Sequence, residues 1–214
     1  MKSIFKNFPW STTLLICVMV YVFYSGRDIG SPGALQGLYE DFLFDWSRFS
    51  HDPRQFWPTL LTHLFLHADQ KHLWGNIIFF LLFAQPVETF LGSLNFLCLY
   101  FLWGIAGALT QGLLLANGTG GYGASAAISG AAGAFLVLYP VAKPFTGFPF
   151  YLKKGLGQVP AFFLILTYFL MTDIKWGFLI LQSGSQITPV GHWAHIGGFL
   201  AGALSMAPFI WKEE

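Results

Sequence analysis

The chain has 214 residues, of which 55% are hydrophobic and only 10% are charged, and its formal net charge is +1. An average soluble domain carries about 25% charged residues, so a soluble globule of this composition could not cover its surface. The near-neutral charge and the lack of a basic stripe with interleaved aromatic residues argue against a nucleic-acid partner. These properties favour an integral protein of the lipid bilayer.

Apolar stretches of spanning length recur along the chain and predict six transmembrane helices, because a span needs ~20 largely apolar residues. We predict one membrane domain over residues 1–214, with helices at about residues 10–26, 70–90, 94–116, 124–142, 158–173 and 190–210. The fifth helix is short unless it continues past Asp173 and Lys175, which we interpret as marking its end in water. The expected fold is an all-α polytopic bundle.

The loop between the first two predicted helices, about residues 27–69, is long and rich in Trp, Phe, Tyr and Leu. Amphipathic aromatic segments prefer the membrane interface, so we expect this loop to lie partly in the membrane. No internal repeat is visible, which weighs against transporters built from duplicated halves.

The basic residues predict an orientation in the membrane. An even number of spans puts both termini on one side, and that side holds Lys2, Lys6, Lys143, Lys153, Lys154 and Lys212. The other side holds Arg27, Arg48, Arg54, Lys71 and Lys175. Under the positive-inside rule this difference favours cytoplasmic termini.

Four polar residues fall near the outer ends of three predicted helices. His72 and Asn76 lie in the first turns of the second helix, Ser125 begins the fourth, and His195 lies just over one turn into the sixth. With a rise of ~1.5 Å per residue, all four should sit at a similar shallow depth. Polar side chains within spans normally face the protein interior or a water-filled cavity, so we expect these residues to converge.

Together these residue types could carry out acyl transfer. A serine hydroxyl needs a base to take its proton, and a neutral histidine is the usual base, which suggests the pair Ser125 and His195. Asn76 and His72, four residues apart on one helix face, could hold the charge that develops on a carbonyl oxygen. The Ser125 amide at a helix N-terminus would add a donor, and Gly123 would permit a close approach.

Each residue also has a structural interpretation. A serine in a helix rich in glycine and alanine is most often a packing residue. We interpret Ser129 in this way, together with Gly130, Ala131 and Ala134, and the pair Gly198 and Gly202 also suits close helix contact. We assign no partner to His51, His63 and His192.

Several motifs match one known family, in order and at matching spacing, from about Phe56 to Gly202. FLHADQKHLWGN contains His67, His72 and Asn76, and GASAAISG resembles a G-x-S-G nucleophile motif with Ser125 in the serine position. AHIGGFLAG contains His195, Gly198 and Gly202, and VETFLGS contains Glu88 and Gly92 in an E-x-x-x-G pattern. With these motifs the sequence resembles the rhomboid intramembrane serine proteases.

The resemblance implies a rhomboid-like bundle of six transmembrane helices that hydrolyses a peptide bond in or near a transmembrane segment of a membrane-protein substrate. It implies a dyad without a third, acidic member: Ser125 would be the nucleophile, and His195 the general base and then the acid. His72, Asn76 and the Ser125 amide would hold the oxyanion. No metal or organic cofactor is implied. The compact core resembles bacterial members, which suggests the inner membrane, with the site opening toward the periplasm.

Two departures from the family pattern bear on the site. Ala126 replaces the glycine that follows the serine, and its methyl group could narrow the approach to the nucleophile. Ser129 stands where an aromatic residue often supports the histidine ring. His195 is then either braced by another ring, such as that of Trp193, or held less firmly.

Two alternatives to an active protease remain open. A rhomboid-like pseudoprotease would bind transmembrane helices without cutting them, although such relatives usually lack the serine or the histidine, and this chain keeps both. A small polytopic channel or transporter would need a polar pathway across the whole membrane, whereas the polar cluster here is predicted near one face only.

Overall fold

The structure, a computed structural model, describes residues 8–27, 40–115, 121–142, 160–183 and 190–210. Within these ranges the regular structure is helical, apart from an isolated antiparallel bridge between Phe44 and Gly121. The prediction of an all-α protein is therefore confirmed. The basic residues on which the predicted orientation largely depends lie outside the described residues: Lys2, Lys6, Lys143, Lys153, Lys154 and Lys212.

The long helices follow the predicted apolar stretches. They are α2 (Trp10–Arg27), α7 (Gln70–Leu91), α8 (Ser93–Leu114), α9 (Ser125–Leu138) and α13 (His192–Ile210). The fourth predicted helix extended to residue 142, but α9 ends at Leu138. Tyr139 precedes Pro140, and the residue before a proline disfavours the α conformation. Residue 116, the predicted end of the third helix, lies outside the described residues.

The fifth helix continues past Asp173 and Lys175, so its predicted end at residue 173 was wrong. It consists of α11 (Ala161–Phe169), a π-helical turn named η3 (Leu170–Ile174) and α12 (Lys175–Ser183), which follow one another without a break. The chain therefore does not leave the bundle at Asp173, which is buried, with 1% exposure. The predicted start of this helix, residue 158, lies outside the described residues.

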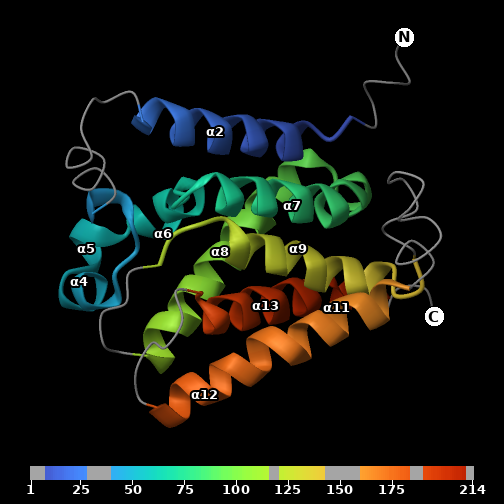
Figure 1. The fold of residues 1–214 in the computed structure, drawn as a ribbon. Coiled ribbons are helices and arrows are strands. Elements are labelled where there is room, and N and C mark those ends of the chain that lie inside the picture. The colour runs from blue at the N-terminus through green and yellow to red at the C-terminus, as the bar shows by residue number, and fades with distance from the viewer. Residues whose placement is uncertain (1–7, 28–39, 116–120, 143–159, 184–189, 211–214) are drawn as a thin grey trace.

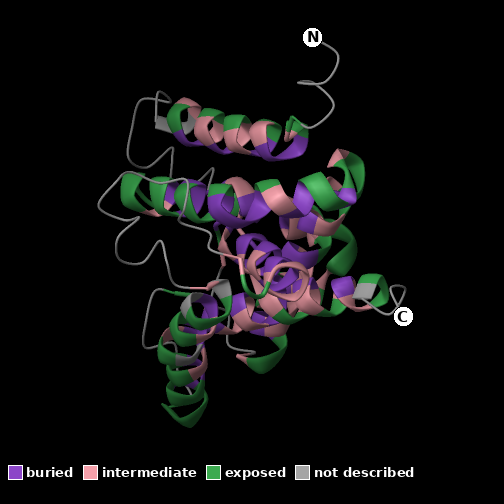
Figure 2. Cartoon of the chain, turned by 90° about the vertical axis from the view of Figure 1, so that its right-hand side faces the viewer, coloured by how far each residue is buried: buried purple, intermediate pink, exposed green. Residues whose placement is uncertain are grey.

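Much of the outer surface of the bundle is apolar. Among the described residues, α7 and α8, of 22 residues each, are long and apolar enough to cross a membrane, and α2 and α9 contain shorter apolar stretches. Large side chains such as Leu94 and Leu204 are more than two-thirds exposed. The buried faces of the helices turn inward and the exposed faces outward (Figure 2). Such a large exposed apolar surface is typical of a protein surrounded by lipid.

Helix α13 packs against both α9 and α8, while α2 packs on α7 at the top of the view in Figure 1. A Cβ atom at Gly198 would overlap the carbonyl oxygen of Ala126, and one at Gly202 would overlap that of Gly130. Gly202 lies four residues after Gly198, and its partner Gly130 lies four residues after Ala126. The helices α9 and α13 therefore run parallel in close contact. Small residues permit this approach of two backbones, as the sequence predicted for these glycines.

Glu88 joins the first helix to the second and third. Its buried carboxylate accepts hydrogen bonds from the backbone N–H groups of Ser11 and Thr12, both at 2.8 Å, and from the Thr12 and Ser93 hydroxyls. These amides are in the first turn of α2, where no intrahelical acceptor is available and a negative charge is favoured. Gly92, with φ of +79°, then makes the turn between α7 and α8.

The first loop is partly described and forms short helices before the bundle. These are α4 (Trp46–His51), α5 (Pro53–Phe56), α6 (Thr59–Thr62) and the 3-10 turn η1 (His63–Phe65). The loop contacts the segment before α9, because Phe44 and Gly121 exchange backbone hydrogen bonds and the His63 carbonyl accepts from Gly123 N–H at 2.8 Å. That the loop lies partly in the membrane stays a prediction.

Replacing Glu88 by glutamine should destabilise the bundle. Glutamine is neutral and retains one acceptor oxygen, so both N–H groups at the start of α2 lose a charged partner and one of them loses its acceptor. Hydrogen bonds to charged groups contribute ~1.5–3 kcal/mol each. We expect Glu88→Gln to lower the free energy of unfolding in detergent by about 2 kcal/mol, while Thr89→Ala, an exposed change on the same turn, has little effect. Equal stability of Glu88→Gln and the wild type would contradict the role of this carboxylate.

The first loop should also respond to acid. Burial lowers the pKa of His63 from 6.5 to about 4, although its Nδ1 lies 2.7 Å from the Thr59 carbonyl. Burial likewise lowers the pKa of His67 to about 4. Between pH 4 and pH 6.5 the unfolded chain binds more protons than the folded chain. The contribution of these two neutral histidines to the free energy of unfolding is therefore fully present above pH 6.5 and is lost as the pH falls toward 4.

At ~1.4 kcal/mol per pH unit, His63 alone should account for a loss of about 3 kcal/mol in the free energy of unfolding over this range. Unfolding measured from pH 7 to pH 4 should show a steeper decline for the wild type than for His63→Gln. Parallel curves would show that His63 does not titrate as its burial requires.

Candidate functional site

The segment before α9 is held against α7 at a glycine. Gly123 has φ of +115°, a conformation that residues with a side chain rarely adopt. A Cβ atom there would lie 2.9 Å from Cε1 and Nε2 of His72 and 3.7 Å from Nδ2 of Asn76. The structure thus brings three of the predicted site residues together, and it explains why the position next to the His72 ring is a glycine.

Asn76 provides a buried donor without a partner. Its side chain is 9% exposed, and among the described residues its Nδ2 atom has no hydrogen-bond acceptor. A buried donor left unpaired costs ~1–3 kcal/mol, so its persistence here indicates a ligand atom that it could meet. Asp69 caps the start of the same helix by accepting from His72 N–H at 2.9 Å.

His67, the first histidine of the FLHADQKHLWGN stretch, is fully buried and lies behind His72. The two rings meet edge to face, with centroids 5.1 Å apart, and His67 Nδ1 lies 3.2 Å from the Phe65 carbonyl oxygen. This packing limits the positions that the His72 ring can take. His67 therefore supports the neighbouring ring.

Ser125 is the first residue of α9 and is partly exposed. The parallel register of α9 and α13, which pairs Ala126 with Gly198, places Ser125 opposite the helical turn that contains His195. His72 and His195 are also close enough for their charges to interact. In the part of the chain that the structure describes, no hydrogen bond joins the Ser125 hydroxyl to His195; in proteins without bound substrate such bonds are often long.

His195 is held by an acid that the sequence analysis did not assign to the site. Its Nδ1 atom lies 2.8 Å from Oδ1 of Asp173, and Nδ1 of His192 lies 2.9 Å from the same oxygen. The interpretation of Asp173 as a helix end in water was therefore wrong, and the histidine of the expected dyad has a carboxylate beside it. The position of this acid within an apolar helical stretch is the signal in the sequence that could have identified Asp173 as a residue of the site.

Trp193, one candidate support for the His195 ring, lies elsewhere. Its indole N–H donates to the Gly177 carbonyl at 3.1 Å, and its ring meets Phe178 of α12. The start of α13 is fixed from the other side by Gln111 of α8, whose Oε1 accepts from Ala194 N–H at 3.1 Å. The N-terminal end of α13 is therefore held by both α8 and α12.

The two departures from the family pattern have different surroundings. The Ala126 side chain is buried, and a Cβ atom added at Gly107 would lie 2.7 Å from the Cβ atom of Ala126. The methyl group thus occupies the space above a glycine of α8, which removes the reason to expect it near the nucleophile. Ser129 is half-buried on α9 and, among the described residues, makes no side-chain hydrogen bond.

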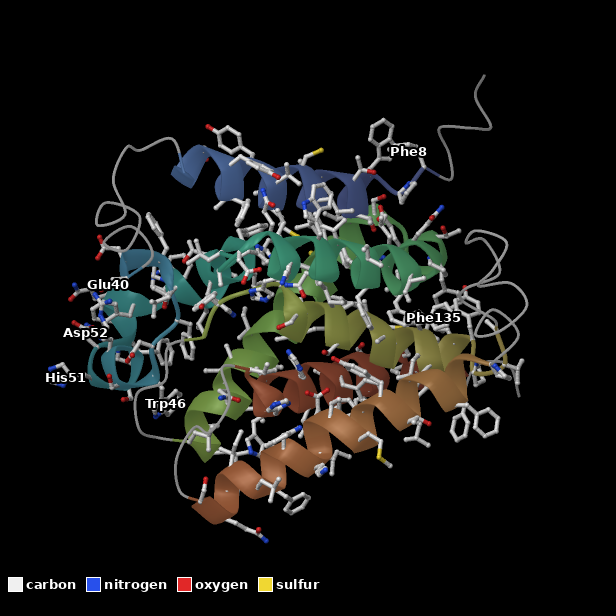
Figure 3. The ribbon with its side chains drawn as sticks, viewed as in Figure 1. Phe8, Glu40, Trp46, His51, Asp52 and Phe135 are labelled. Atoms are coloured by element: carbon white, nitrogen blue, oxygen red, sulfur yellow. The ribbon has the colours of Figure 1, made fainter. Side chains whose placement is uncertain are left out.

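The remaining histidines fall into two groups. His51 is exposed on α4, beside Asp52 and Glu40 at the outer edge of the first loop (Figure 3). His192 belongs with His195 and Asp173, and the three possible ligand atoms lie within 4.8 Å of one another, so this group could also bind a metal ion.

A comparison with models of protein families matches residues 53–212 to the Rhomboid domain. A comparison with curated proteins gave no match. The matched range includes every residue placed at the site above and covers well over half of the chain. The protein is thus a member of the rhomboid family.

Proposed function

We propose that this protein is an intramembrane serine endopeptidase that cleaves membrane-protein substrates in or near their transmembrane segments. Most rhomboid proteins are serine proteases, although some members are inactive. The observation that carries the proposal is the contact of Gly123, just before Ser125, with His72 and the unpaired Asn76 amide, together with the register that sets Ser125 opposite the turn of His195.

The proposed reaction begins with attack by the Ser125 oxygen on the scissile carbonyl carbon. His195 takes the hydroxyl proton on Nε2, since its Nδ1 faces Asp173. When the C–N bond breaks, the same proton passes to the leaving amine, and an acyl-enzyme remains on Ser125. A water molecule, with His195 again as base, then releases the new carboxyl group and restores the serine.

The oxyanion of the tetrahedral intermediate would meet donors from two helices. Asn76 Nδ2 and the His72 ring come from α7, and the Ser125 N–H is a first-turn amide of α9 that has no intrahelical acceptor. Because these donors are fixed before the reaction, they stabilise the developing charge without reorganisation. The unpaired state of Asn76 Nδ2 supports this assignment.

We extend the proposal to the placement in the membrane. Six helical segments would cross the bilayer, with the termini in the cytoplasm of a bacterial cell and the site near the outer face. Ser125 and His195 are both near the N-terminal ends of parallel helices, so the site would be shallow. A substrate helix would have to unwind locally there, because its own hydrogen bonds shield its peptide groups.

A non-cleaving, substrate-binding rhomboid protein is the second candidate. The observation that favours it is the lack of a hydrogen bond between Ser125 and His195, both of which are described residues. Cleavage measurements separate the two functions directly, because a pseudoprotease would bind a transmembrane peptide without releasing product.

Substitution of either reacting residue should abolish cleavage. In liposomes with a fluorogenic transmembrane peptide, we expect Ser125→Ala and His195→Ala to reduce the rate to background, with unfolding of each variant measured in parallel. Ser129→Ala is the matched serine control, since this residue lies one turn along the same helix; at most a modest loss is expected. Full activity of Ser125→Ala would exclude the mechanism.

Loss of the Asn76 amide should act on the chemical step. We expect Asn76→Ala to lower kcat by about 100- to 1,000-fold, the usual effect of removing one oxyanion donor, with little change in KM. Asn95→Ala serves as the control, because the Asn95 side chain donates to the Leu91 carbonyl in another part of the bundle. An effect confined to KM would argue against an oxyanion role.

A further inference from the structure

Asp173 is a carboxylate buried inside an apolar helical segment, a position that is costly unless the charge is paired. Its side chain is 2% exposed, and one oxygen, Oδ1, lies within 2.9 Å of ring nitrogens of both His192 and His195. The two imidazoles offset the cost of burial. Neither the bundle packing nor the glycine contacts between α9 and α13 requires an acid at this position.

The backbone around Asp173 is also specialised. Asp173 belongs to the π-helical turn η3, which packs against α13 between the regular helices α11 and α12. A π turn inserts an extra residue into a helix and is frequently found at functional sites. Here the turn contains the carboxylate that lies within hydrogen-bond distance of both His192 and His195.

The hydrogen bonds determine where the protons of the two rings lie. An ionised carboxylate can only accept, so Nδ1 of His195 and Nδ1 of His192 must both carry hydrogen. In a neutral His195 the lone pair is then on Nε2. That nitrogen is the one available to accept the hydroxyl proton of Ser125, and the opposite tautomer would present an N–H to the serine instead.

We propose that Asp173 is a positioning residue that holds His195 in the tautomer and orientation required for general-base catalysis, and that it completes a Ser125–His195–Asp173 triad. This inference rests on the proposed protease function. Asp173 stays ionised throughout: the serine proton moves to Nε2 of His195, Nδ1 keeps its own proton, and the carboxylate stabilises the imidazolium until the leaving amine takes the proton.

His192 has a supporting part in this arrangement. It donates to the same oxygen of Asp173, and its ring stacks on Trp176 with centroids 6.4 Å apart. Two histidines on successive turns at the start of α13 thus hold the Asp173 carboxylate. This support replaces the aromatic ring that the family pattern places where Ser129 stands in this chain.

The test compares Asp173→Asn, Asp173→Ala and the wild type by kcat and KM for a transmembrane peptide in liposomes. Loss of tautomer control by a triad acid can cost up to about 10⁴ in kcat, so we expect at least a 100-fold fall in kcat with KM changed less than about twofold. Asparagine should be no better than alanine, because its amide can donate to Nδ1 and favour the wrong tautomer.

Glu88→Gln is the matched control, since Glu88 is also a buried carboxylate with several hydrogen bonds but lies away from the site. It should lose stability while keeping the kcat of the folded protein. Equal kcat for Asp173→Asn and the wild type would overturn the inference, as would an asparagine variant much more active than alanine, which would indicate a packing role.

Two further measurements distinguish a failure of the protease function, a failure of the triad and a metal-binding role. If the Ser125→Ala variant cleaves normally, the protease function itself fails; if only Ser125→Ala is inactive and Asp173→Asn is normal, the triad alone fails. Activity should be unchanged by a chelator such as EDTA. Loss of activity on chelation, with recovery on adding zinc, would instead assign Asp173, His192 and His195 to a metal and overturn the positioning role.

Discussion

The close parallel contact between α9 and α13 is the constraint on which the site depends. Gly198 and Gly202 let the backbone of α13 approach the carbonyl oxygens of Ala126 and Gly130, and this fixes the register of the two helices. Because Ser125 begins one helix and His195 lies near the start of the other, the same register brings their turns opposite each other. A larger side chain at either glycine would separate the two helices, and with them Ser125 and His195.

The few buried charged groups organise an otherwise apolar bundle. Glu88 caps the start of α2 at one end of α7, and Asp173 binds the two histidines at the start of α13. Each carboxylate is paired with several donors, as burial demands. Among the described residues, Glu88 and Asp173 are the buried carboxylates, and Asp173 is the one that contacts histidines.

The sequence predicted the helices well where the apolar runs were long and bounded by glycine or proline. The contacts of Gly123 agree with the expectation that His72 and Asn76 lie near the segment before Ser125, whereas the pairing of Ser125 with His195 stays a prediction. The prediction failed at Asp173, where an acid was taken as a sign of water. That inference could not succeed without tertiary structure, since the partners of the acid, His192 and His195, are about twenty residues away.

The central claim, that Ser125 is a nucleophile activated by His195, is tested most directly by covalent labelling. The folded protein would be treated with a fluorophosphonate, which reacts with activated serines, and the modified residue identified by peptide mass spectrometry. The account predicts a single label on Ser125 in the wild type and none in His195→Ala. A label on another serine, or labelling of Ser125 that persists without His195, would contradict it.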